Sequence, residues 1–375
     1  MARACQVPIG CLLAAVISTS GFAAASAQEA ATRVVHESVS CPACRIVATR
    51  VRALRSALNL GEPFSAVRDR SGHIVVSLQA SPPVVLNVRG TILRFLEAGR
   101  GRTDFSSPPV VFSCEHGLIC ALDPRAQRLY FYDSTLSCAR ELRSEMLPAN
   151  SIVQLPNGEF VEAGVWPTPE MAGYPLHRYS TEGAWRASFG VDVPLFIDTA
   201  SEGLQRSISP DGRGGFWAAH RSAWEIERWD STLRVTLRIV RNPAWFQPYA
   251  QPHHLSPDSA PPPQLLAVIE DTAMGLVWSI ARVPSTRWQS AGVTARVTPD
   301  GRRFYAPLHP DRLYQSLIEV LDPSKARVVA RLRINATLVR LVPGGIAIGV
   351  RRSSRGTVTE LWRLRLEGWS GGGVR

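Results

Sequence analysis

The chain is poor in lysine. Lys325 is the only lysine among 42 basic residues, so the formal net charge of +11 comes almost entirely from arginine. Nucleic-acid-binding proteins usually gather such charge on one face or one helix. Here the arginines alternate with apolar residues, as in residues 234–240 and 327–334. This alternation is typical of strands with one solvated face, and it argues against a nucleic-acid partner.

The chain also lacks an uninterrupted apolar run of about 20 residues, the length that a membrane-spanning helix needs. Residues 1–27 contain one basic residue, Arg3, followed by a short apolar run and by small residues ending in Ala25, Ser26 and Ala27. These features are typical of a secretory signal peptide that is cleaved after Ala27. We therefore expect an exported protein, periplasmic or secreted, without a transmembrane segment.

Helical periodicity is nearly absent after the signal peptide. Short runs of strand type dominate instead, and glycine, proline, aspartate and serine separate them. These runs recur as units of four strands, and each unit is typical of one antiparallel blade of a β-propeller. We therefore predict an all-β, six-bladed propeller. The six units cover approximately residues 62–99, 106–144, 150–190, 204–242, 263–334 and 336–368.

The turn between the first and second strands of each unit supports this alignment. Each turn ends near a glycine, a residue that adopts a positive φ at little cost. The six glycines are Gly72, Gly117, Gly158, Gly212, Gly275 and Gly344. Stacked β-sandwiches are the alternative all-β architecture, but they do not require evenly repeated four-strand units.

The sixth unit has three strands, so a closed ring would leave the edge of its last strand unpaired. Residues 45–54 alternate loosely between apolar and polar side chains and belong to no other unit. We predict that they form the missing fourth strand. The alternative is an amphipathic helix, because arginine, alanine and leucine also favour helices. The chain then divides into a signal peptide at 1–27, an N-terminal segment at 28–60 and a propeller at 61–375.

Residues 90–135 resemble the repeat of NHL-type six-bladed propellers. The matching positions are Gly99, Gly101, Phe105, Pro108, Gly117, Asp123 and Asp133. More broadly, the chain resembles exported bacterial six-bladed propellers of the TolB-like superfamily. This resemblance implies the same fold.

Removal of the signal peptide leaves five cysteines, an odd number, so at least one thiol is left over or pairs between chains. They are Cys41, Cys44, Cys114, Cys120 and Cys138. We interpret the Cys-x-x-Cys pair as structural, either a local disulfide or buried thiols. A redox centre would need a helix N-terminus in a βαβ setting, and a zinc site would need a second close pair; both stay open as alternatives.

The second cysteine pair, Cys114 and Cys120, straddles a hairpin turn, and a disulfide between these two is a further expectation. Neither a Gly-x-Ser-x-Gly elbow nor a lysine-containing phosphate loop occurs. His253, His254 and Asp258 form the best isolated metal-like cluster, but the surrounding prolines favour an exposed loop.

Propellers place ligands at the central channel, near the starts of the inner strands. A calcium site with hard oxygen ligands is one hypothesis for the polar residues just before these strands, as in gluconolactonase-like propellers that hydrolyse lactones or phosphotriesters. Polar residues are also simply common in loops. The candidates are Glu62, Asp104, Asn150, Glu202, Gln264 and Asn335.

No catalytic constellation is recognisable. We therefore expect a monomeric binding module without a cofactor, whose loops take a protein, a peptide or a carbohydrate. A calcium-dependent lactonase or esterase is the alternative. Five tryptophans near the second strands are expected to pack between blades, and any that reach the rim could stack on a ligand. These are Trp166, Trp217, Trp245, Trp278 and Trp288.

Overall fold

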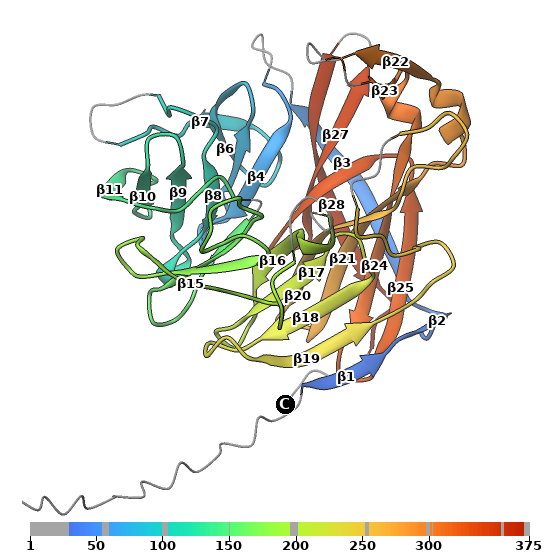
Figure 1. The fold of residues 1–375 in the computed structure, drawn as a ribbon, viewed down its shortest axis with the longest axis horizontal. Coiled ribbons are helices and arrows are strands. Elements are labelled where there is room, and N and C mark those ends of the chain that lie inside the picture. The colour runs from blue at the N-terminus through green and yellow to red at the C-terminus, as the bar shows by residue number, and fades with distance from the viewer. Residues whose placement is uncertain are drawn as a thin grey trace, which may run out of the picture.

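The computed structural model describes residues 30–54, 60–99, 104–149, 151–195, 202–251, 255–297, 301, 303–353 and 356–370. Six four-stranded antiparallel blades form a ring, as predicted (Figure 1), and in two of them a further strand joins the outer edge. The signal peptide expected at 1–27 lies outside the described residues. No helix in the part of the chain described is long and apolar enough to cross a membrane.

The blades are numbered along the chain, and each runs from an inner strand to an outer one. Blade 1 contains β4 (Pro63–Arg68), β5 (Ile74–Leu78), β6 (Ser81–Leu86) and β7 (Ile92–Phe95). Blade 2 contains β8 (Val110–Ser113), β9 (Ile119–Asp123), β10 (Arg128–Tyr132) and β11 (Cys138–Arg143), with the 3-10 helix η1 (Glu115–Gly117). Blade 3 contains β12 (Ser151–Gln154), β13 (Phe160–Ala163), β14 (Leu176–Tyr179) and β15 (Trp185–Phe189).

The second half of the ring carries an insertion and borrows one strand. Blade 4 contains β16 (Arg206–Pro210), β17 (Phe216–His220), β18 (Glu225–Trp229) and β19 (Val235–Val240). Blade 5 contains β20 (Gln264–Asp271), β21 (Leu276–Pro284), β24 (Tyr314–Asp322) and β25 (Arg327–Ile334). Its insertion holds η2 (Trp288–Ala291), the hairpin of β22 (Val293–Val297) and β23 (Arg303–Pro307), and η3 (Pro310–Arg312). Blade 6 contains β26 (Thr337–Val342), β27 (Ile346–Ser353), β28 (Gly356–Glu367) and β3 (Arg45–Leu54).

β3 closes the ring. It pairs antiparallel with β28 along its whole length, from Arg45 opposite Glu367 to Leu54 opposite Thr359. The predicted closing strand is therefore confirmed, and the helical alternative is wrong. Isolated helix propensity is overridden here because the strand satisfies the free edge of β28 and buries apolar side chains on both faces.

The hydrophobic core lies between the blades and not within any one of them. Six clusters of buried side chains each join two neighbouring blades. Successive side chains of a strand point to opposite faces, so Ile74 and Val76 of β5 pack toward blade 6 while Val75 packs toward blade 2. β3 shares this role, because Ile46 enters the interface with blade 5 and Leu54 the interface with blade 1.

Two short strands upstream of β3 were not predicted. β1 (Ala31–Val34) runs parallel to the outer strand of blade 4, and β2 (His36–Val39) runs parallel to the outer strand of blade 5. Figure 1 shows both in blue along β19 and β25. Between them Val35 is 4% exposed and packs into the core shared by blades 4 and 5. The segment therefore pairs with the outer edges of blades 4 and 5 before it enters blade 6.

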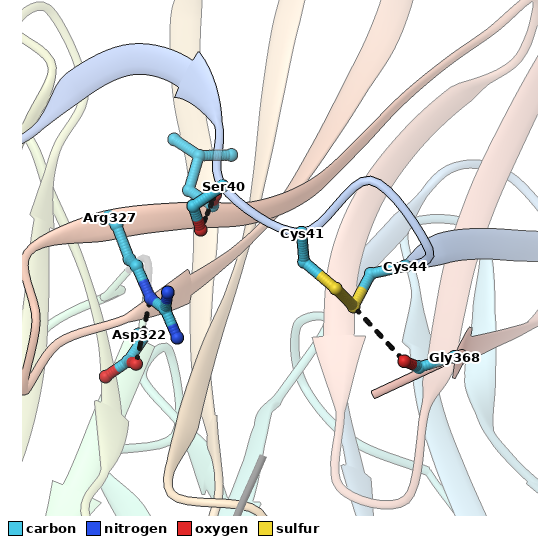
Figure 2. The surroundings of a disulfide bond; sticks show 7 residues. Ser40, Cys41, Cys44, Asp322, Arg327 and Gly368 are labelled. Carbon is cyan, nitrogen blue, oxygen red and sulfur yellow. Dashed lines mark hydrogen bonds and ion pairs between the residues drawn. A yellow bond between two sulfur atoms is a disulfide. The ribbon is translucent and has the colours of Figure 1, made fainter. Parts of the chain in front are cut away.

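The turn between β2 and β3 carries a disulfide between Cys41 and Cys44 (Figure 2). The sulfur of Cys44 lies 3.6 Å from the carbonyl oxygen of Gly368, just beyond the end of β28. Gly368 has a φ of +76°, and a Cβ there would collide with the carbonyl oxygen of Ala43. The turn thus lies directly against the C-terminal end of β28, the strand with which β3 pairs.

A second disulfide joins Cys114 to Cys120 across the turn between β8 and β9, and Cys138 lies outside both disulfides. Five of the six turn glycines have the expected positive φ. The expectation for Gly212 is wrong: Gly214, with a φ of +88°, has the left-handed conformation in that turn. Residues 211–215 form a turn of the same length as residues 69–73 and 155–159. Gly214 is its fourth residue, the place that Gly72 and Gly158 take in their turns, whereas Gly212 lies two residues earlier.

Many of the strand arginines bind buried glutamates, so they are not simply solvated. A glutamate on the third strand of blades 4, 5 and 6 is at most 3% exposed and faces an arginine on the fourth strand. The pairs are Glu227–Arg238 at 2.9 Å, Glu319–Arg331 at 2.6 Å and Glu360–Arg50 at 3.3 Å. Arg241 also binds Glu319 through two contacts of 2.8 and 2.9 Å, which ties blade 4 to blade 5.

Ring closure yields a first prediction. A chain that starts at residue 41 loses β1, β2 and the burial of Val35, worth about 1.5–3 kcal/mol, and should remain a folded monomer with a lower melting temperature. A chain that starts at residue 55 also loses β3, exposes the edge of β28 and opens two cores, and should aggregate. Thermal unfolding and size-exclusion chromatography of the two variants test this. A stable monomer that starts at residue 55 would contradict the assignment of β3.

Candidate functional site

The six inner strands, β4, β8, β12, β16, β20 and β26, surround a central cavity of about 340 Å³. Its serines connect neighbouring blades: Ser65 Oγ accepts a hydrogen bond from Val111 N at 2.8 Å, and Ser151 Oγ accepts one from Ile208 N at 2.8 Å. These hydroxyls therefore hold the ring together. At the end where the inner strands finish, Asp211 is paired with Arg228 at 2.8 Å.

The opposite end, where the inner strands begin, is the channel mouth. Glu62 lies there, just before β4, and Arg352 of blade 6 donates to both of its carboxylate oxygens at 2.6 Å. Hydrogen bonds from Arg352 lower the pKa of Glu62, against the opposing effect of burial. Glu202, just before β16, lies 3.7 Å from the Nε of Arg221. Each of the two acids at the mouth therefore has an arginine partner.

The other candidates are dispersed. Asp104 lines a separate groove of about 860 Å³ beside the outer strands of blades 1 and 2, with Phe95 and Asp133. Asn335 is exposed in the connection from β25 to β26. Asn150 lies outside the described residues, as do His253 and His254. Among the described candidates, the structure brings together only Glu62, Glu202 and Gln264 at the mouth.

A cavity of about 240 Å³, here called the mouth cavity, opens beside Glu202. Three strands of blade 5 position its side chains, because Gln264 begins β20, Arg282 lies near the end of β21, and Tyr314 begins β24. Gln264 and Arg282 are direct register partners. Tyr249 reaches the cavity from the connection between blades 4 and 5, where its backbone N donates to Ser222 O at 3.0 Å. The apolar part of the lining is Leu255, Pro262 and Leu313.

Electrostatics at the mouth cavity are set by Arg282. Its guanidinium carbon lies 4.3 Å from the centre of the Tyr314 ring, a cation–π contact. One Nη of Arg282 donates to Oε1 of Gln264, which also accepts from Arg221 at 3.2 Å. Burial lowers the pKa of Arg282 and raises that of Tyr249 to about 12. At neutral pH the cavity therefore presents a protonated hydroxyl beside the guanidinium group.

The acids at the mouth were predicted from the sequence, but the arginines were not. Arg221, Arg282 and Arg352 stand at the ends of the second strands of blades 4, 5 and 6. A signal was present, since Arg-Ser occurs at residues 221–222 and again at 352–353, at equivalent places in two repeats. Equivalent positions in a propeller converge on the same face, so the recurrence indicated a basic mouth.

One metal-like group exists among the described residues. His220, Glu225 and Glu227 offer ligand atoms within 4.8 Å of one another. Arg238, however, binds Glu225 and Glu227, each at 2.9 Å. Burial and the nearby charge of Arg206 lower the pKa of His220. Arg238 thus already pairs with both carboxylates that a cation would need, and the charge of Arg206 acts on the same two groups.

Side chains whose pKa is strongly shifted are also candidates for a functional site, and blade 3 holds one such pair. Glu162 and His177, both 0% exposed, are register partners on β13 and β14. Burial raises the pKa of Glu162 to about 8 and lowers that of His177 to about 4. Trp166 Nε1 and Leu147 N donate to Glu162 at 2.9 and 3.2 Å. Neither residue lines the channel or the mouth cavity, so we assign the pair to the interior of the blade.

Solved structures share this fold. A member of the DUF4221 family from Bacteroides vulgatus is 9% identical, with a TM-score of 0.54 over 86% of this chain and 97% of that chain. A candidate exported protein from Bacteroides fragilis is 11% identical, with a TM-score of 0.53 over 90% and 99% of the two chains. Virginiamycin B lyase from Staphylococcus aureus is 12% identical, with a TM-score of 0.42 over 85% and 99%.

No protein-family model and no curated protein matches the chain. At these low identities the likeness establishes the fold and no activity. The chain is thus a six-bladed β-propeller, as its resemblance to exported bacterial propellers implied.

The buried carboxyl in blade 3 predicts a pH effect on stability. Between pH 4.5, the ordinary pKa, and about 8, the unfolded chain releases the Glu162 proton while the folded chain retains it. The unfolded state then binds fewer protons, so this carboxyl makes stability fall as pH rises. Glu162→Gln removes the effect. Its stability relative to the unaltered protein should increase with pH across this window, on the order of 1 kcal/mol per pH unit. Urea unfolding at several pH values measures it, and parallel profiles would contradict the assigned pKa.

Proposed function

We propose that the protein is an exported binding module whose channel mouth takes a protein, peptide or carbohydrate partner. The observation that carries this proposal is the pairing of Glu62 with Arg352 and of Glu202 with Arg221. Calcium takes 6–8 oxygen ligands, and carboxylates already engaged by guanidinium groups are poor members of such a shell. The mouth is therefore better suited to recognition than to metal-dependent hydrolysis.

The lining of the mouth cavity also supports recognition. Two tyrosines, a glutamine and an arginine stand beside an apolar wall, and together they offer a ring face, hydrogen-bonding groups and a charge within one concavity. Small-molecule and peptide sites combine apolar surface with a few polar groups in this way. The exported location is part of the same proposal, supported by the signal-peptide pattern at residues 1–27.

Binding at the mouth should not require calcium. On glycan and peptide arrays, the labelled protein should bind the same ligands with and without EDTA, and Tyr249→Ala should lose that binding because it removes one wall of the mouth cavity. Calcium content after dialysis should be substoichiometric, and EDTA should leave the melting temperature unchanged.

Leu93→Ala is the matched control, because Leu93 is 50% exposed on β7 of blade 1, outside the mouth cavity. It should bind like the unaltered protein. The binding proposal would be wrong if the protein held stoichiometric calcium that Glu202→Ala removes and also hydrolysed a lactone or an ester. The calcium-dependent hydrolase would then take its place. Array binding that survives Tyr249→Ala would show that the partner docks elsewhere.

A further inference from the structure

We propose that the mouth cavity binds a carboxylate group of its ligand, and that Arg282 is the residue that receives it. This inference rests on the proposed binding function of the mouth. It specifies the chemical class of ligand, which could be the free carboxylate of a peptide or of an acidic sugar.

Charge at the mouth is unevenly compensated. Arg352 is matched by Glu62, and Arg221 by Glu202. Two further arginines, Arg282 in the mouth cavity and Arg340 in the central cavity, have no ion-pair partner among the described residues. The mouth therefore carries a net positive charge that an anionic ligand would balance.

Arg340 uses its donors on backbone carbonyls. Its Nε and Nη2 donate to Phe64 O at 3.0 and 2.6 Å, and its Nη1 donates to Val339 O at 2.9 Å. The two bonds to Phe64 O fasten β26 of blade 6 to β4 of blade 1. Arg340 thus adds positive charge to the central cavity, while its hydrogen bonds hold neighbouring blades together.

Arg282 differs in what its guanidinium contacts. One Nη donates to Gln264, and the ring of Tyr314 lies against the guanidinium. Its Nε is buried and has no hydrogen-bond partner among the described residues. A buried charged donor without an acceptor is costly, and a ligand oxygen would relieve that cost.

A second donor lines the same cavity. The hydroxyl of Tyr249 is buried beside Gln264, and its proton has no acceptor in the described part of the chain. The one unpartnered acceptor in the lining, Oε2 of Glu202, already faces the charge of Arg221 at 3.7 Å. The Nε–H of Arg282 carries positive charge and the Tyr249 hydroxyl offers a second proton, so a negatively charged ligand group that accepts hydrogen bonds would satisfy both.

A carboxylate fits these features better than a phosphate does. Its planar pair of oxygens matches guanidinium geometry, and a monoanion suffers less repulsion from Glu202 than a phosphate dianion would. The cavity of about 240 Å³ lies below the roughly 300–1,000 Å³ of drug-sized sites, so it holds a small group. Leu255, Pro262 and Leu313 provide the apolar surface for the body of that group.

Benzoate is the probe, titrated into the full exported chain by calorimetry, beside its neutral analogue benzamide and beside phenyl phosphate. Benzoate should bind, and benzamide should bind at least about tenfold more weakly, the factor expected for one charge-assisted hydrogen bond. Arg282→Gln should lower the affinity for benzoate by about the same factor. Arg365→Gln, at an exposed position on β28, is the matched control and should leave the affinity unchanged.

Tyr249→Phe is a second variant that tests the site even if Arg282→Gln does not fold, because it removes one hydroxyl and leaves the ring in place. It should lower the affinity for benzoate severalfold and leave the melting temperature unchanged. No benzoate binding, equal affinity for benzamide, tighter binding of phenyl phosphate, or an Arg282→Gln variant that binds like the unaltered protein would each overturn the inference. Array binding that Tyr249→Ala abolishes and Arg282→Gln spares would overturn it while leaving the proposed function intact.

Discussion

The pairing of β3 with β28 is the contact on which the rest of the structure depends. No blade has a core of its own, because each hydrophobic cluster is shared by two neighbours. An open array would expose one face of a terminal blade and the edge of β28. A strand from the other end of the chain removes both defects at once. The disulfide turn at Cys41 and Cys44 holds the start of this strand against Gly368 (Figure 2).

Closure also creates the mouth. Glu62 belongs to the chain entering blade 1 and Arg352 to the end of β27 in blade 6, so their bidentate contact spans the closing interface. Arg340 bridges the same two blades through the carbonyl of Phe64. The acids and arginines near the closure are therefore partly structural. Arg282 in blade 5 lines the mouth cavity. Unlike Arg221 and Arg352, it has no carboxylate partner among the described residues, and this makes it the proposed point of recognition.

The repeat architecture could be predicted because four-strand units with turn glycines recur along the chain. The closing strand could be predicted because the sixth unit has only three strands. β1 and β2 could not be predicted, because each has only four residues. Both add parallel strands to edges that the repeat pattern already counts as complete. Glu62 and Glu202 located the mouth correctly, but their pairing with arginines was not predicted. Glu62 and Arg352 are far apart in sequence, and only ring geometry shows that they meet.

Hydrogen exchange along the closing sheet tests the central claim most directly. If β3 is an integral strand of blade 6, the amides that pair it with β28 should exchange as slowly as those of β27 and β28, by global unfolding only. β1 and β2, strapped to outer edges, should exchange faster. Rapid exchange of β3 beside a protected β27–β28 pair would show that the ring is stable without its N-terminal strand, and would contradict the account.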